Sequence, residues 1–206
     1  MKYYAEFGTD KFIIENYFPG KTDGIMVEVG AALPEEISTS KAFHDLGWRC
    51  INIEPNPSYA EAHRKAGNEI HQLALSNKPG EDLEFNIYTS PDKVHHGMSY
   101  SCLKGKGTPK PIPPTWVPWI QTIKVKVITF NQLLESLNVD KLDFVSIDVE
   151  GWEIEVMKGF DVNKYNPKVI LLENLDNLSH IPRYMQSIGF KKVHALQQNE
   201  IYMRDE

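Results

Sequence analysis

Three acidic residues follow a short apolar run in the segment VSIDVEGWE: Asp148, Glu150 and Glu153. The run before them, residues 142–147, is apolar enough to form a buried strand. Carboxylates are costly beside an apolar core unless a hydrogen bond, a cation or a metal ion compensates for their charge. We therefore expect this part of the chain to bind a cation, a metal ion or a group that donates hydrogen bonds.

A second pair of oxygen-bearing residues follows another apolar run. Residues 168–172 lead directly to Glu173 and Asn174. Together with Asp148, this pair offers carboxylate and amide oxygens, which are the ligands that Mg²⁺ and Mn²⁺ prefer. Such an ion would lower the pKa of a bound substrate hydroxyl and orient its oxygen for reaction.

The same region also allows chemistry without a metal. Asp148 would then contact the ammonium group of a cofactor, and Glu150 would act as general base on a hydroxyl. His180 and the pair His95–His96 are further candidates for the base. Clustered acids can also be stabilised by the N-terminus of a helix, and a helix is predicted to begin directly after this segment. The sequence leaves these alternatives open.

Hydrophobic periodicity predicts the elements that position these residues. The predicted helices cover residues 9–18, 34–47, 56–67, 130–137, 152–160 and 177–189. The predicted strands cover residues 25–29, 49–54, 69–76, 81–89, 123–129, 142–147, 168–173, 190–196 and 200–204. This alternation indicates one α/β domain over residues 1–206, with a mostly parallel sheet covered by helices and a closing hairpin.

The carboxyl ends of the predicted strands carry small or acidic residues. In an open α/β sheet, ligands bind beyond these ends, near the point where the strand order reverses. Glu28 and Gly30 belong to the first strand end, Glu54 to the second, and residues 74–76 to the third. We expect them to lie at one edge of the sheet together with Asp148.

The turn after the first strand is poorly suited to a phosphate-bearing cofactor. It lacks the complete G-x-G-x-x-G pattern, because Ala32 and Pro34 stand where glycines would be expected. Glu35 and Glu36 fall in the first turn of the helix predicted to follow, where they would repel a phosphate. The pattern therefore favours a nucleoside without phosphates, with its ribose hydroxyls bound by Glu54. S-adenosylmethionine is a ligand of this kind.

Several segments of the chain, taken in order, resemble the FkbM family of methyltransferases. They are EFGTDKFIIENYF, GIMVEVGA, GWRCINIEPNPSYA, ALS, VSIDVEGWEIEVMKGF and ILLEN. EPNP and DVEG at this spacing are the most specific of the matching motifs. The resemblance implies a Rossmann-like class I methyltransferase fold, with a seven-stranded sheet and helices on both faces. It also implies transfer of a methyl group from S-adenosylmethionine to a hydroxyl, often on a sugar or a natural product.

The resemblance further implies which residues bind the cofactor. From the methionine end to the adenine they would be Glu28, Gly30 and Ala31, then Glu54, Pro55 and Asn56, then Ala74, Leu75 and Ser76. The first loop of the family more usually contains glycine and asparagine, whereas this chain has AALPEE. The later strand ends resemble the catechol-type O-methyltransferases, in which an aspartate and an Asp-Asn pair hold a divalent ion. By that likeness Asp148, Glu173 and Asn174 would be the metal ligands.

The middle of the chain, residues 89–121, has no visible period and is rich in proline and glycine. A loop of this length in a compact domain is usually functional, and we expect it to cover the active site. Tyr100, Trp116 and Trp119 would be able to stack on a sugar ring, although burial against the sheet is the alternative for the tryptophans.

The composition argues against two classes of partner, nucleic acids and the interior of a membrane. The net charge of −6 argues against a nucleic-acid partner, and no apolar run is long enough to span a membrane. Cys50 and Cys102 have no metal-site spacing and are expected to be free thiols in a reducing cytoplasm.

The sequence therefore favours an S-adenosylmethionine-dependent O-methyltransferase that acts on a carbohydrate hydroxyl, with or without a divalent metal. An NAD-dependent nucleotide-sugar epimerase or dehydrogenase is the main alternative, and the acidic, glycine-poor first turn disfavours it. Two other hypotheses are a methyltransferase for a non-sugar acceptor and a non-catalytic partner subunit. The intact acids at the strand ends argue against the last of these.

Overall fold

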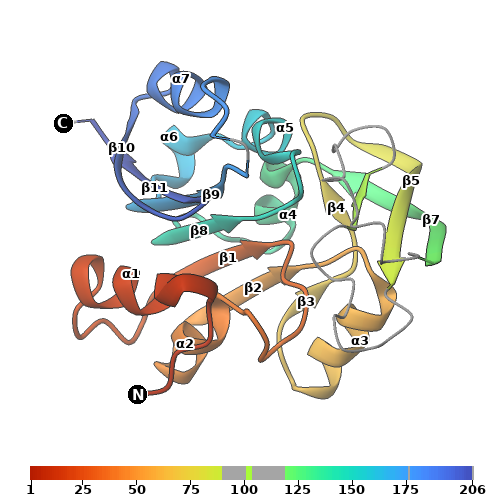
Figure 1. Ribbon diagram of the computed structural model, residues 1–206, viewed down its shortest axis with the longest axis horizontal. Helices are drawn as coiled ribbons and strands as arrows, with labels where there is room; N and C mark the ends of the chain where they lie inside the picture. Colours follow the sequence, from red (N-terminus) through yellow and green to blue (C-terminus); the bar gives the residue numbers. More distant parts are fainter. Residues whose placement is uncertain (90–100, 104–118, 176, 206) are drawn as a thin grey trace.

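A computed structural model describes residues 1–89, 101–103, 119–175 and 177–205 and contains two β-sheets (Figure 1). The larger sheet has seven strands in the order β10-β11-β9-β8-β1-β2-β3. Their bounds are β1 Ile25–Val29, β2 Arg49–Ile53, β3 Ile70–His71, β8 Phe144–Ile147, β9 Val169–Glu173, β10 Phe190–Leu196 and β11 Asn199–Arg204. Five neighbouring strands are parallel, and β10 and β11 form an antiparallel hairpin at one edge. The predicted mostly parallel sheet with a closing hairpin is confirmed.

Helices cover both faces of this sheet, because alternate strand residues point to opposite sides. The helices are η1 Glu6–Gly8, α1 Thr9–Tyr17, α2 Ser40–Asp45, α3 Pro57–Lys65, α4 Phe130–Ser136, α5 Glu153–Lys158, α6 Val162–Tyr165 and α7 His180–Ser187. Met26 and Phe144 belong to the apolar cluster that includes residues of α1 and α2. Their neighbours Val27 and Val145 belong to the cluster that includes residues of α4, α5, α6 and α7.

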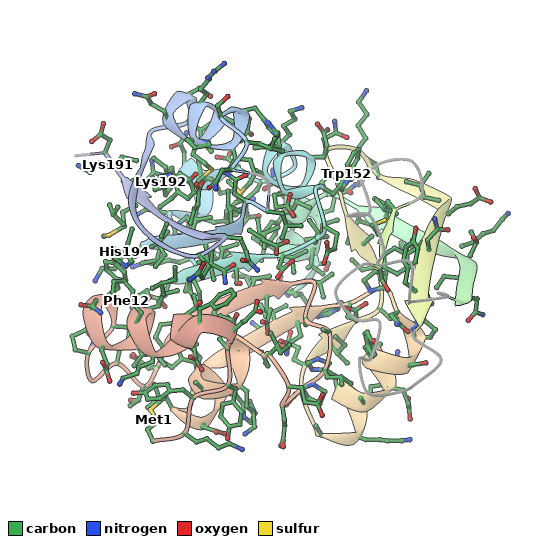
Figure 2. All side chains as sticks on the ribbon, in the orientation of Figure 1. Met1, Phe12, Trp152, Lys191, Lys192 and His194 are labelled. Carbon is green, nitrogen blue, oxygen red and sulfur yellow. The ribbon has the colours of Figure 1, made fainter. Side chains whose placement is uncertain are left out.

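The N-terminal helix α1 also packs against the C-terminal hairpin. Phe12 of α1 stacks on His194 of β10, with ring centroids 4.3 Å apart and ring planes inclined by 10° (Figure 2). Segments from the two ends of the chain therefore lie side by side.

The sequence did not predict the second sheet. Its four strands are β4 Ala74–Leu75, β7 Trp119–Ile128, β5 Gly80–Thr89 and β6 Cys102–Leu103, in that order. The prediction of one strand over residues 69–76 is wrong, because the chain turns between β3 and β4. The Leu73 N–H donates to the His71 carbonyl oxygen at 3.0 Å in this turn, and β4 then pairs with β7. Strand β6 and the first residues of β7 also fall inside the segment predicted as a loop.

Helix α2 begins later than predicted, at Ser40 instead of near residue 34. Ile37 has a φ of +56°, which is incompatible with an α-helix, and so the preceding acids Glu35 and Glu36 lie outside the helix. The buried carboxylate of Glu28 accepts hydrogen bonds from the Thr39 N–H at 2.8 Å and the Ser40 N–H at 3.1 Å. This pair of bonds fixes the start of the helix, because it satisfies N–H groups that have no partner within the helix.

No helix within the described ranges is long and apolar enough to cross a membrane. Both cysteines, Cys50 and Cys102, are buried thiols that form no disulfide, as predicted.

Candidate active site

Four strand ends meet at one edge of the large sheet, because the registers of β2, β1, β8 and β9 are aligned. The residues at this level are Glu54, Gly30, Asp148 and Glu173, one from each strand. The strand order also reverses here, since β1 leads to β2 on one side and has β8 on the other. This is the position at which open α/β sheets bind their ligands.

A cavity of about 290 Å³ lies over these strand ends. Its walls are partly apolar, with Leu73, Leu75, Phe85 and Leu103 among the residues that line it. The described part of the lining contains no lysine, arginine or histidine, whereas its acidic residues are Glu6, Glu28, Glu36, Glu54, Asp148, Glu150 and Glu173. This charge distribution favours a cationic or uncharged ligand over an anion.

Gly30 allows the loops after β1 and β8 to approach each other closely. Its φ is +83°, and a Cβ atom at this position would lie 1.8 Å from the Asp148 carbonyl oxygen. A side chain therefore cannot be accommodated without moving the backbone that carries Asp148. Glycine is therefore required here by the approach of the Asp148 backbone.

Glu54 is buried, and its carboxylate connects the loop after β1 to the loop after β2. One carboxylate oxygen accepts from the Ala32 N–H at 3.0 Å, and the other accepts from the Asn56 N–H at 2.7 Å. Burial raises the pKa of Glu54 to about 7, and it raises the pKa of Glu28 to about 7 in the same way. Each carboxylate oxygen can accept more than one hydrogen bond, so Glu54 can still bind hydroxyl groups of a ligand in the cavity.

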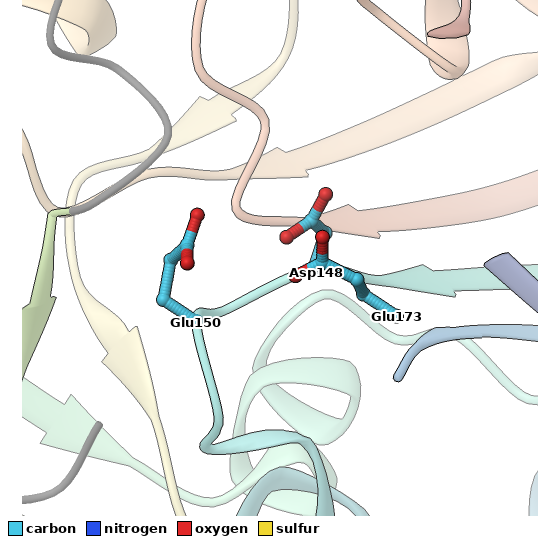
Figure 3. A group of neighbouring side chains, drawn as sticks. All are labelled: Asp148, Glu150 and Glu173. Atoms are coloured by element: carbon cyan, nitrogen blue, oxygen red, sulfur yellow. The ribbon is translucent and has the colours of Figure 1, made fainter. Parts of the chain in front are cut away.

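Asp148, Glu150 and Glu173 form a carboxylate triad, in which one oxygen of each residue lies within 4.8 Å of the others (Figure 3). Asp148 is exposed, Glu150 is half-buried and Glu173 is buried. The Oε2 atom of Glu173 has no hydrogen-bond partner among the described residues. Burial and the negative charge of Asp148 raise the pKa of Glu173.

The loop that carries Glu150 has an unusual backbone. Glu150 has a φ of +58° and Gly151 a φ of +92°, so two successive residues are left-handed. Glu153 stabilises this loop, because its Oε1 atom accepts from the Val149 N–H at 3.1 Å and the Gly151 N–H at 3.0 Å. Of the three acids in VSIDVEGWE, Asp148 and Glu150 face the cavity, whereas Glu153 stabilises the loop.

Trp152 connects this loop to the second sheet. Its Nε1–H donates to the Ser76 hydroxyl at 3.2 Å, and the indole lines the cavity. Ser76 was predicted to border adenine. It is buried and does not itself line the cavity, whereas its neighbours Ala74 and Leu75 do.

The remaining predicted residues divide into two groups. Pro55 lines the cavity, whereas Ala31 and Asn56 are buried behind it, where the Asn56 side chain accepts from the Ser58 N–H and caps α3. The Asn174 side chain bonds to both backbone groups of Leu178 and does not line the cavity.

The structure does not bring the predicted histidine bases to the cavity. His180 is exposed at the start of α7 and is not part of the described lining. His95, His96, Tyr100 and Trp116 lie outside the described residues.

Sequence patterns missed several residues of the cavity. Trp152 directly follows the DVEG motif and was given no role, although Asp148, Val149 and Glu150 of that motif line the cavity. Glu6, Gln198 and Asn199 come from the two ends of the chain, and no periodic or spacing signal connects them to the strand ends.

The fold and the cavity define a class of protein: an α/β protein with an acidic cavity at the reversal of strand order in a mostly parallel sheet. The sequence profile of the family described as Methyltransferase FkbM domain matches residues 28–192. The chain therefore belongs to the FkbM family and is a methyltransferase. A search of curated proteins finds no match to it.

Proposed function

We propose that this methyltransferase has the class I Rossmann-like fold and transfers the methyl group of S-adenosylmethionine to a hydroxyl of a carbohydrate, assisted by Mg²⁺ or Mn²⁺. The observation that carries this proposal is the position of the carboxylate triad. It lies directly beside the strand ends that carry Gly30 and Glu54, so a cofactor on those strand ends would present its reactive end to three oxygen-bearing side chains.

The charge of the cavity supports this cofactor. S-adenosylmethionine supplies a methyl group on a positively charged sulfur atom and carries an ammonium group, and the described lining is acidic. Glu54 would accept hydrogen bonds from the ribose hydroxyls, while Ala74 and Leu75 would border the adenine. Membership of a methyltransferase family argues against the NAD-dependent alternative. In addition, Glu28 occupies the N–H groups at the start of α2 that a phosphate would need.

The carboxylate triad fits a divalent ion. Its hard oxygen atoms are suitable ligands, and the buried Oε2 atom of Glu173 has no partner within the described residues. A bound ion would act as a Lewis acid toward the acceptor hydroxyl. As the acceptor oxygen attacks the methyl carbon and the carbon–sulfur bond breaks, Glu150 would take the hydroxyl proton.

Calorimetric titration with S-adenosylhomocysteine tests the cofactor. We expect wild type to bind and Glu54→Gln to bind roughly tenfold more weakly, about 1.4 kcal/mol. Glu61→Gln is the matched control, because Glu61 forms only exposed ion pairs on α3. No heat with S-adenosylhomocysteine, or binding of NAD in its place, would contradict the proposal.

Titration with Mn²⁺, followed by electron paramagnetic resonance, tests the metal. We expect Asp148→Asn to weaken Mn²⁺ binding at least about tenfold, because it removes one negative ligand. Asp140→Asn changes an exposed aspartate outside the cavity lining and is the control. Equal Mn²⁺ affinity in all three proteins would leave Glu150 to act without a metal.

A further inference from the structure

One rim of the cavity is built by two segments outside the part of the chain that matches the family, residues 28–192. The N-terminal segment contributes Glu6, the turn between β10 and β11 contributes Gln198, and the start of β11 contributes Asn199. These segments contact each other: Gln198 Nε2 donates to Glu6 Oε2 at 3.5 Å, and Asn199 Nδ2 donates to Thr9 Oγ1 at 3.4 Å. This rim, formed by Glu6, Gln198 and Asn199, lies outside the residues that match the family profile.

The rim adjoins the carboxylate triad. Asn199 is paired with Glu173 across β11 and β9, and the Asn174 N–H donates to the Gln198 carbonyl oxygen at 2.8 Å. Glu54, the proposed ribose ligand, lies on the other side of the triad, because β2 is separated from β9 by β1 and β8. The cofactor and the rim would therefore occupy opposite sides of the triad, which leaves the rim for the acceptor.

The side chains of the rim suit a ligand rich in hydroxyl groups. Amides both donate and accept hydrogen bonds, and a carboxylate accepts them, so the rim can satisfy neighbouring hydroxyls of either orientation. Gln198 and Asn199 are half-buried and Glu6 is exposed, so an acceptor can reach them from solvent. A phosphate, sulfate or carboxylate at this position would face the carboxylate of Glu6, and the described lining supplies no basic side chain to offset the repulsion.

We propose that Glu6, Gln198 and Asn199 bind the non-reacting hydroxyls of an uncharged sugar, and that the site rejects anionic sugars. The inference rests on the proposed O-methyltransferase function and adds the charge class of its acceptor. Because these residues touch the acceptor and not the cofactor, their loss should raise the KM for the acceptor and leave S-adenosylhomocysteine affinity unchanged.

The experiment measures transfer of radiolabelled methyl from S-adenosylmethionine to matched sugars. The neutral members are the methyl glycosides of glucose, galactose and mannose, and the anionic members are the corresponding uronates and 6-phosphates. We expect the neutral sugars to be methylated at least tenfold faster than their anionic partners. We expect Gln198→Ala to raise the KM for the neutral sugar about tenfold with kcat little changed, and Gln198→Lys to improve transfer to the anionic members.

Gln186→Ala is the matched control, because Gln186 is exposed on α7 and is not part of the cavity lining. S-adenosylhomocysteine binding is measured for every variant. Preference for anionic sugars, or an unchanged KM in Gln198→Ala, each with normal S-adenosylhomocysteine binding, would overturn the inference alone. Transfer to none of the sugars, with normal S-adenosylhomocysteine binding, would overturn both the inference and the proposed carbohydrate acceptor. Failure of wild type to bind S-adenosylhomocysteine would instead overturn the proposed function.

Discussion

At the scale of single residues, Gly30 and Glu153 determine the shape of the active site without performing chemistry. Gly30 permits contact between the loops after β1 and β8, and Glu153 satisfies two N–H groups of the loop that carries Glu150. Left-handed backbone at a residue such as Glu150 costs on the order of 1–3 kcal/mol and persists only where its surroundings enforce it.

Gly30→Ala is expected to destabilise the protein by more than about 2 kcal/mol, because its Cβ would overlap the Asp148 carbonyl oxygen. Gly67→Ala is the control, since Gly67 also has a positive φ, +76°, but nothing lies within 4 Å of its Cβ position. It should lose only about 1 kcal/mol. Urea unfolding of both variants measures the difference, and equal losses would show that the contact with Asp148 is unimportant.

Glu153→Ala is expected to cost about 1–3 kcal/mol, because two partly buried N–H groups lose their acceptor. Glu155→Ala removes only the ion pair with Lys158, which lies nearer the surface, and should cost less than about 1 kcal/mol. Mn²⁺ affinity should fall in the first variant and not in the second, since only the first allows the Glu150 loop to change conformation. A stable Glu153→Ala protein with normal Mn²⁺ binding would refute this role.

At the scale of elements, the tryptophan on the Glu150 loop joins the two sheets. The Nε1–H of Trp152 donates to the Ser76 hydroxyl beside β4, at the end of the cavity proposed for adenine. We expect Trp152→Phe to weaken S-adenosylhomocysteine binding several-fold, with a loss of about 1 kcal/mol in stability. Trp48→Phe is matched to it, because Trp48 also donates one hydrogen bond, to the Lys21 carbonyl oxygen, but lies outside the cavity lining. Equal calorimetric affinities for the two variants would contradict the prediction.

The larger sheet and most of its helices could be predicted, because their apolar periods are strong and their caps are explicit. Thr129 and Gln132, for example, form the capping box that begins α4. The true start of α2 could not be predicted, because it depends on the Glu28 carboxylate, which lies eleven residues before Thr39 in the chain. The break between β3 and β4 could not be predicted either. Residues 69–76 have the pattern of one continuous strand, and only the pairing of β4 with β7 separates β4 from β3.

The acids of the site were predictable from their positions after apolar runs. The separate roles of these acids could not be predicted. The backbone hydrogen bonds of Glu153 and the unpaired Oε2 atom of Glu173 depend on the three-dimensional arrangement. The rim could not be predicted from the sequence, because Glu6 and Gln198 are separated by nearly the whole chain.

At the scale of the whole molecule, the buried acids govern how stability depends on pH. Burial raises the pKa of Glu28, Glu54 and Glu153 from 4.5 to about 7 each. Between these two values the folded state binds more protons than the unfolded state, so the free energy of unfolding falls as the pH rises.

We therefore expect the metal-free protein to be more stable near pH 5 than near pH 7.5, by on the order of a few kcal/mol. Urea unfolding in the presence of a chelator, at intervals from pH 5 to pH 8, measures the slope. Glu54→Gln should reduce it, because the amide does not titrate. Stability that rises with pH across this window would show that these carboxyl groups are not desolvated as described.

The position of β11 has a consequence for the order in which the molecule is assembled. This strand follows β10 in the chain but lies between β9 and β10 in the sheet. During synthesis β10 therefore emerges before the strand that connects it to the sheet. The outer edge of the sheet and the Gln198 side of the cavity are completed only when residues 199–204 are available, after the strand ends around Gly30 and Glu54.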